Sequence, residues 1–430
     1  MANEWPTRPL EDVMSAIIDY RGKSPDKTTS GIPLVTAKIV KDGRIGDYDE
    51  FIAEEEYDAW MRRGMPETGD VLITTEAPLG EVAQVKDRQI ALAQRIILLR
   101  GKKDILDNTF FKYQCLSDEF QMLLSGRASG TTVTGIRQSE LRKVPVKLPP
   151  LPVQRQIAAI LSAFDDKIEL NRRMNRTLEQ MARALFKSWF VDFDPVRAKM
   201  RGEAPEGMDA ETAALFPDEL VEIDGRDVPR GWRVGRIGDI AFQGKEQMNP
   251  NAFPDALFAH FSIPAFDSGQ SPTLEPGSNI KSNKFIVPDG AILVSKLNPA
   301  TPRIWNVDKP EGADFNVCST EFIPLVPENS EVAALLYAAL TGDAFRYTLA
   351  DQASGTSNSH QRVKPADIIN APLILPDEEV LATFGSLSIP ILEHMKYNIR
   401  ESTQLAAIRD ALLPRLLAGE IDVSEWEETQ

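Results

Sequence analysis

The stretch IAAILSAFDDKIELNRRMNRTLEQMARAL, residues 157–185, decides the architecture because its apolar positions recur at alternating spacings of four and three. This heptad period is typical of a helix that winds against another helix. The first series is Ile157, Leu161, Phe164, Ile168, Asn171, Asn175, Leu178, Ala182 and Leu185. An equivalent but more polar series follows 227 residues later: Phe384, Ser388, Ile391, Met395, Asn398, Ser402, Leu405, Arg409 and Leu412.

Two interpretations of these helices are open. In the first, each amphipathic helix packs only into the core of its own domain. In the second, which we favour, the two helices pair with each other as a spacer. Asn171 and Asn398 occupy equivalent positions of the two series, and a polar residue in a helix seam sets the register of a coiled coil at a cost in stability.

The rest of the chain is also duplicated. Residues 69–85, GDVLITTEAPLGEVAQV, and 289–307, DGAILVSKLNPATPRIWNV, each predict a turn, a strand, a loop with proline and a second strand. The tetrapeptide Ala-Ser-Gly-Thr occurs at 128–131 and again at 353–356, and a proline-containing segment precedes each long helix. The order is domain, long helix, acidic linker, domain, long helix. Two related domains on a helical rod would match a DNA duplex that is contacted at two places.

Composition limits the class of protein. The 430 residues suffice for two to four domains, 42% are hydrophobic, and the two cysteines are too few for a disulfide framework. No apolar run is long enough to span a membrane, so we expect a cytoplasmic protein with no membrane partner. The net charge of −16 argues against nucleic acid, but residues 201–230 alone hold 9 acidic and 3 basic side chains. A local basic surface elsewhere therefore remains compatible with the charge.

Motifs for catalysis are not found. The three histidines form no metal-ligand pattern, Gly22-Lys23-Ser24 lacks the preceding glycine of a phosphate loop, and no Asn/Asp-Pro-Pro-aromatic motif of an adenine methyltransferase is present. Asp70 and Glu76 lack the lysine of a nuclease site, and their carboxylates are more typical of a turn cap and a loop. The sequence predicts a binding protein with no metal site and no catalytic residue.

Three segments carry a resemblance to a known family. LPPLPVQRQIAAIL (148–161), DDKIELNRRMNRTLEQMARALFKSWFVDFDPV (165–196) and LLPRLLAGEI (412–421) resemble the conserved helical regions of the specificity subunit of type I restriction-modification systems. GIRQSEL (135–141) and Arg21-Gly22-Lys23 resemble features of its target-recognition domains. The second domain departs from this pattern at Phe242-Gln243-Gly244-Lys245-Glu246, so we expect it to prefer different bases.

The resemblance implies an α+β fold in which two related target-recognition domains are separated by two long helices forming an antiparallel coiled-coil spacer. The predicted domains are 1–150 (first target-recognition domain), 151–200 (first long helix), 201–230 (acidic linker), 231–376 (second target-recognition domain) and 377–430 (second long helix and tail).

The resemblance also implies a division of labour. This chain would bind double-stranded DNA at a bipartite, asymmetric site and perform no chemistry. Two methyltransferase subunits would use S-adenosylmethionine to methylate adenines, while motor-nuclease subunits, whose presence the sequence leaves open, would use ATP and Mg. The chain itself would bind no cofactor.

Candidate DNA contacts are Lys and Arg for phosphates and Arg, Asn and Gln for base edges, in loops that occupy equivalent positions of the repeat. They are Arg21, Lys23, Lys38, Lys41, Thr75, Arg137, Gln138, Lys245, Gln247, Lys296, Asn298, Ser357, Asn358, His360, Gln361 and Arg362. Each could instead be a solvated surface residue. The candidates for docking a partner subunit, which we expect to be exposed, are Leu185, Phe186, Trp189 and Phe190. Their alternative role is in the core.

Two alternative functions remain at this point. A protein-only scaffold is favoured by the negative charge. A DNA enzyme would need a catalytic site that the motifs do not reveal.

Overall fold

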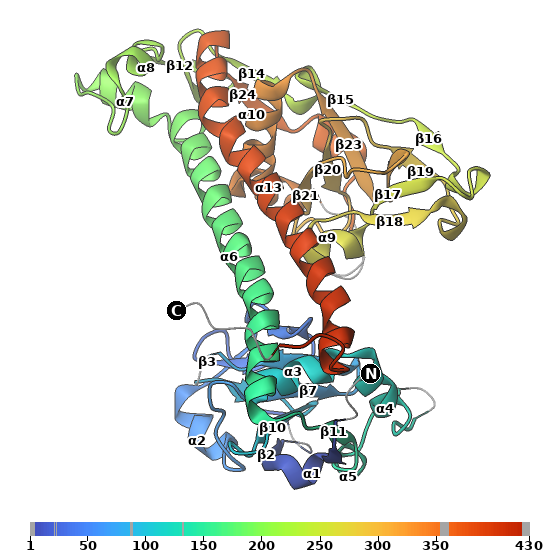
Figure 1. Cartoon of the computed structure of the whole chain (residues 1–430). Helices are drawn as coiled ribbons and strands as arrows, with labels where there is room; N and C mark the ends of the chain where they lie inside the picture. Colours follow the sequence, from blue (N-terminus) through green and yellow to red (C-terminus); the bar gives the residue numbers. More distant parts are fainter. Residues whose placement is uncertain are drawn as a thin grey trace. The chain divides into compact units, whose positions relative to one another are not determined.

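The computed structural model describes residues 5–20, 22, 24–86, 89–130, 133–352 and 361–423 (Figure 1). It divides into two compact units, of which the first comprises Met1–Lys167 with Leu405–Gln430 and the second Ile168–Gln404. Both units mix helices with sheets, as the sequence predicted. Within the described ranges no helix has the length and hydropathy needed to cross a bilayer.

The first unit is built around an antiparallel sheet with strand order β2-β10-β7-β8. Its strand β10 is buried from Ile96 to Leu99. These residues form a continuous apolar run, as expected for a strand that is covered on both faces. The strands are β1 (Thr7–Pro9), β2 (Met14–Asp19), β3 (Ile32–Val35), β4 (Val40–Lys41), β5 (Arg44–Ile45), β6 (Phe51–Ile52), β7 (Val71–Thr75), β8 (Leu79–Gln84), β9 (Ala91–Leu92), β10 (Ile96–Gly101) and β11 (Pro145–Lys147). The short helices are α1 (Leu10–Val13), η1 (Glu54–Glu56), α2 (Tyr57–Trp60), α3 (Asn108–Leu116), α4 (Asp118–Ser125) and α5 (Gln138–Leu141).

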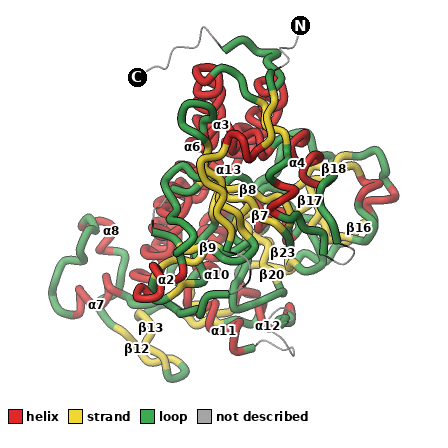
Figure 2. The backbone as a smooth tube through the Cα atoms, turned by 90° about the horizontal axis from the view of Figure 1, so that it is seen from below, coloured by secondary structure: helices red, strands yellow, loops and turns green. Residues whose placement is uncertain are grey.

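The second unit contains a sheet with the order β15-β23-β20-β21, covered by α10 (Figure 2). Its strands are β12 (Leu220–Ile223), β13 (Arg226–Pro229), β14 (Arg233–Arg236), β15 (Ala241–Gln243), β16 (Gln247–Met248), β17 (Leu257–Phe261), β18 (Thr273–Pro276), β19 (Lys284–Ile286), β20 (Ile292–Ser295), β21 (Ile304–Asn306), β22 (Phe315–Cys318), β23 (Phe322–Pro327) and β24 (Pro372–Leu375). Its short helices are α7 (Asp194–Met200), α8 (Ala210–Ala214), η2 (Ile237–Asp239), η3 (Pro250–Ala252), α9 (Ile263–Gly269), η4 (Gly277–Asn279), α10 (Ser330–Thr341), α11 (Asp343–Asp351) and α12 (Pro365–Ile369).

The two units share one topology. The order β2-β10-β7-β8 of the first corresponds to β15-β23-β20-β21 of the second, and the pair β1–β11 corresponds to β14–β24. A parallel pair lies in each second sheet, β3 with β9 and β17 with β22. The second unit extends this sheet to five strands by adding β19 and β16. The internal repeat predicted from sequence is therefore a repeat of structure.

Each half ends in a helix of 40 residues, α6 (Leu151–Phe190) and α13 (Glu378–Leu417). The predicted end of the first helix at residue 200 is wrong, because Phe193 adopts a left-handed φ of 55° and interrupts the helix. A separate helix, α7, then starts at Asp194, where Pro195 has no N–H for a continuing helix to use.

The helices contact each other in the second unit through a polar layer. Asn171 donates to the carboxylate of Glu401 (2.6 Å), and Asn398 donates to the side-chain oxygen of Asn175 (2.8 Å). Asn175 in turn donates to the carbonyl of Met395 (3.1 Å). Later residues of α6 meet earlier residues of α13, so the helices are antiparallel here. Asn171 and Asn398 are buried at this contact. Over this stretch the two helices pair with each other, so the interpretation in which each packs only into the core of its own domain does not hold here.

A partly buried charge cluster, which we call the Asp165 cluster, holds both helices to the first unit. The Asp165 carboxylate of α6 accepts from Lys112 (2.9 Å) and Tyr113 (2.6 Å) of α3, and from Arg409 (2.5 Å) of α13. Burial alone would raise the pKa of Asp165, but its three donors outweigh burial, so the pKa lies below its ordinary value. The carboxylate is thus the shared anchor of three elements.

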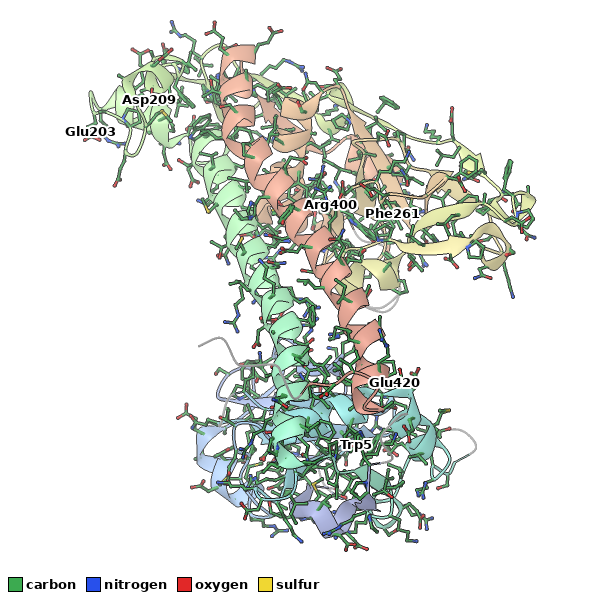
Figure 3. The ribbon with its side chains drawn as sticks, viewed as in Figure 1. Trp5, Glu203, Asp209, Phe261, Arg400 and Glu420 are labelled. Carbon is green, nitrogen blue, oxygen red and sulfur yellow. The ribbon has the colours of Figure 1, made fainter. Side chains whose placement is uncertain are left out.

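Residues 201–230 are not an unstructured linker. They contain α8 and the β12–β13 hairpin, and Glu203 and Asp209 are labelled on this segment in Figure 3. Phe216 and Val228 are buried in the main core of the second unit. The acidic side chains of the segment lie on its outside while its few apolar residues cover the end of α6.

The segment 201–230 covers the end of α6, so the expectation that the aromatic residues there are exposed is wrong. Phe186, Trp189 and Phe190 are buried rather than exposed, and Leu185 packs partly buried against the same core. The Trp189 ring lies 4.9 Å from that of Phe216 and 5.9 Å from that of Phe384, between ring centroids. These side chains stabilise the second unit and offer no exposed docking surface.

Candidate nucleic-acid interface

One end of the four-stranded sheet in the second unit gathers several predicted DNA contacts. β20 ends there at Ser295, which is paired with Phe322 at the start of β23. The chain beyond β20 is then bound by a segment from far along the sequence. Val363 N–H donates to the Lys296 carbonyl (3.1 Å), and Asn298 N–H donates to the Gln361 carbonyl (3.0 Å). Lys296, Asn298, Gln361 and Arg362 are thereby brought together, and we call this end the second rim.

β15 leaves the sheet at the same end. Gly244 N–H donates to the carbonyl of Pro324, close to the start of β23 (2.9 Å). The chain then leads into the exposed Lys245 and Gln247.

The first unit has an equivalent end, which we call the first rim. β7 ends at Thr75, and Ile136 N–H donates to the Thr75 carbonyl (2.9 Å). Glu76 and Gly135 form an isolated β-bridge, the counterpart of the bridge between Leu297 and Arg362 in the second rim. Arg137 and Gln138 follow directly, with Arg137 exposed and Gln138 half-buried.

A further backbone bond confirms that the rims are equivalent. Thr75 N–H donates to the Arg95 carbonyl (2.9 Å), and Lys296 N–H donates to the Glu321 carbonyl (2.8 Å). Arg95 and Glu321 each directly precede the central strand of their sheet, β10 and β23. The two rims thus share a backbone scaffold while their side chains differ.

Each rim carries one Arg–Glu ion pair, with the charges placed differently. In the first rim Arg95 at the strand start contacts Glu76 on the loop, with Nε 3.3 Å from the carboxylate. In the second rim the strand start carries the acid, Glu321, and Arg362 contacts it through Nε and Nη2 at 3.1 and 3.2 Å. Hydrogen bonding to Glu321 raises the pKa of Arg362, so its guanidinium remains charged.

The loop that follows β7 in the first rim and β20 in the second has the same unusual backbone. Ala77 has φ 46° and Asn298 has φ 53°, and each precedes a proline. Asn tolerates this left-handed region, whereas Ala pays about 1–2 kcal/mol for it. Strain of this kind persists where the surrounding structure holds a functional loop in place.

The other predicted DNA contacts lie apart from the rims or outside the described residues. Lys38 is paired with Asp49 on the surface. Lys41 is exposed in the β4–β5 hairpin, where Gly43 N–H donates to the Val82 carbonyl of β8. Five predicted contacts lie outside the described residues: Arg21, Lys23, Ser357, Asn358 and His360.

The structure contradicts the prediction that Thr75 contacts DNA. It is 1% exposed and its hydroxyl donates to the Arg95 carbonyl (3.3 Å), because the last residue of β7 lies under the loop and not on it. Sequence reasoning missed Arg95 and Glu321. The signal available was their equivalent place as the first residues of two apolar segments, RIILLR (95–100) and EFIPLV (321–326).

Nothing in the described part of the chain forms a group of three or more residues able to hold a metal ion. His260 is bonded to Glu275 (2.8 Å) on the neighbouring strand, and burial lowers its pKa. Cys115 and Cys318 are buried, and burial raises the pKa of both thiols.

Comparison with known proteins identifies the family. Residues 3–180 match the model of the type I restriction modification DNA specificity domain. The type I restriction enzyme HindI specificity subunit of Haemophilus influenzae is 31% identical over 354 residues, covering 71% of this chain and 74% of that protein. The chain belongs to the specificity subunits of type I restriction enzymes. The role of such a specificity subunit is DNA recognition rather than catalysis.

Other relatives agree with this assignment. The MjaIX specificity subunit of Methanocaldococcus jannaschii is 27% identical over 368 residues, covering 83% of this specificity subunit and 78% of that one. The crystal structure of a type I restriction-modification S subunit from M. genitalium is similar in fold, with a TM-score of 0.51 at 15% identity and 96% coverage of both chains.

Proposed function

We propose that this specificity subunit recognises a bipartite, asymmetric DNA sequence, one half with each unit, and directs adenine methylation and restriction by partner subunits. The observation that carries the proposal is the pair of rims. Their backbones are equivalent, so both can approach DNA in the same way, while their side chains differ, so they would select different bases.

The proposal includes the partners. Two methyltransferase subunits would bind S-adenosylmethionine, and motor-nuclease subunits would use ATP and Mg, while this chain would bind no cofactor. An adenine inside a duplex must be turned out of the stack before it can be methylated, so these enzymes would distort the DNA that the specificity subunit holds. The assembly would act in the cytoplasm.

The antiparallel helices would serve as a coiled-coil spacer between the two half-sites. Each helix begins in one unit and ends in the other, since Lys167 and Gln404 close the first and second unit on α6 and α13. The polar layer around Asn171 and Asn398 would fix their register, because a slipped pairing would leave these buried amides without partners.

Mapping methylated adenines across the genome, with and without this chain, tests the function. We expect one methylated motif with two unlike halves that disappears when the chain is absent. Replacing residues 1–150 by another recognition domain is expected to change one half and leave the other. A change of both halves, or of neither, would contradict the assignment of one half-site to each unit.

Spacer length is expected to follow helix length. Inserting one heptad after Lys167 and one after Gln404 preserves the seam of both helices and adds about 10 Å at 1.5 Å per residue. The unspecified spacer of the methylated motif is then expected to grow by about three base pairs, since each step rises about 3.4 Å. As a control, a heptad in only one helix shifts the polar layer out of register and should abolish methylation. An unchanged spacer in the doubly extended variant would show that the helices do not measure it.

A further inference from the structure

We propose that Arg95 and Arg362 each recognise one base, a guanine, in the two half-sites, and that Glu76 and Glu321 position their guanidinium groups. This inference rests on the proposed function and deepens it, because it names the side chains that give each unit its own base preference. Both arginines lie at the equivalent sheet end of their unit, beside loops that equivalent backbone hydrogen bonds hold in place.

The two guanidinium groups are accessible and still oriented. The side chains of Arg95 and Arg362 are 48% and 49% exposed, so each reaches the surface of its unit. Glu76 contacts Arg95 through Nε, the nitrogen nearest the chain, so the terminal fork lies beyond the atom that is held. An arginine oriented in this way loses less conformational entropy when it binds.

Charge distinguishes a base contact from a phosphate contact at these positions. A carboxylate beside each arginine repels a phosphate, which is itself an anion. The major-groove edge of guanine has no net charge and offers two acceptors, O6 and N7, which match the two terminal donors of a guanidinium. The Arg–Glu pairs of the rims therefore favour a base edge over the DNA backbone.

The arginine and the glutamate exchange places between the two rims, and this explains how two equivalent scaffolds select unlike DNA sequences. In the first rim the residue that precedes the central strand is the donor Arg95, and in the second it is the acceptor Glu321. The donor of the second rim comes instead from the segment that holds the loop. The guanidinium thus emerges at a different place in each unit, and we expect the guanine to occupy a different position in each half-site.

The test uses the complete complex with its methyltransferase subunits and maps methylated adenines. Arg95→Ala is expected to relax one guanine position in one half-site, and Arg362→Ala one position in the other half. Loss of a bidentate contact should reduce discrimination at that position by about 5- to 150-fold. Arg95→Lys keeps the charge without the fork and is expected to relax the same position, which decides the question if the alanine variant is unstable. Glu76→Gln should relax that position too, to a smaller extent, which loss of a purely structural pair would not do.

Matched controls come from other exposed Arg–carboxylate pairs of the same units. Arg142 lies 3.7 Å from Glu11 in the first unit, and Arg233 lies 3.5 Å from Asp239 in the second. Arg142→Ala and Arg233→Ala should leave the motif unchanged. The inference is overturned if Arg95→Ala and Arg362→Ala weaken methylation of all sites equally, as phosphate contacts would, or if they keep the wild-type motif. A wild-type complex without any bipartite motif would instead refute the proposed function itself.

Discussion

Replacing Asp165 with alanine is expected to lower the free energy of unfolding of the first unit by about 3–5 kcal/mol. The loss arises because the variant leaves the ammonium group of Lys112 buried without its anion. Burial already lowers the pKa of Lys112, and Asp165 offsets only part of that effect. Hydrogen exchange of peptides from α3 and from the end of α13 measures the opening of this unit separately from the rest of the chain.

Two variants serve as controls for the Asp165 cluster. Asp410 also pairs with Arg409 (2.7 Å) but is 62% exposed, so Asp410→Ala should cost less than about 1 kcal/mol. The double variant Lys112→Met with Asp165→Leu removes the buried ammonium group together with its carboxylate, and Arg409 keeps its pair with Asp410, so the variant should recover much of the loss. If Asp165→Ala costs no more than Asp410→Ala, the cluster does not anchor the helices.

The pKa of Asp165 also sets a pH window. Its folded pKa is lowered below the ordinary value of 3.8, so the unfolded carboxyl binds a proton first as pH falls. The contribution of Asp165 is therefore complete above that value and is lost as pH falls through the folded pKa. The difference in stability between wild type and Asp165→Ala should be constant near neutral pH and narrow below pH about 4.

Trp189→Ala is expected to destabilise the second unit by about 3–5 kcal/mol, because it removes a large aromatic side chain from a closed core. Trp189 is 4% exposed and packs between Phe216 and Phe384. Denaturant unfolding of the isolated subunit measures the loss. Met181→Ala changes an exposed side chain of the same helix, which is 52% exposed, and should alter stability by no more than about 0.5 kcal/mol.

The same experiment separates the two roles considered for Trp189. A core residue lowers stability whether or not methyltransferase subunits are present. A docking residue would leave the isolated subunit as stable as the wild type and reduce only its assembly with partners. That second outcome would contradict the burial of the aromatic group and return these residues to the docking surface.

The sequence alone determined the repeat, the two long helices and their shared register. The heptad pattern of α6 and α13 is a local property, since positions three and four residues apart lie on one helix face whatever covers them. The seam positions from Ile157 to Leu185 are all buried or half-buried, as the pattern predicted. The strands predicted within 69–85 and 289–307 were likewise marked by their own apolar runs and flanking turns.

Only the tertiary structure decided what those faces contact. The pattern marks Phe186, Trp189 and Phe190 as apolar, but it cannot say that a segment rich in acidic residues folds back to cover them with Phe216. Likewise, Arg362 contacts Glu321, 41 residues earlier in the chain, because a β-bridge between Leu297 and Arg362 brings the segment at 361–363 to the end of β20. Pairing between distant segments depends on the whole fold and on loop closure rather than on local propensity. The sequence alone therefore could not show which distant segments meet at each rim.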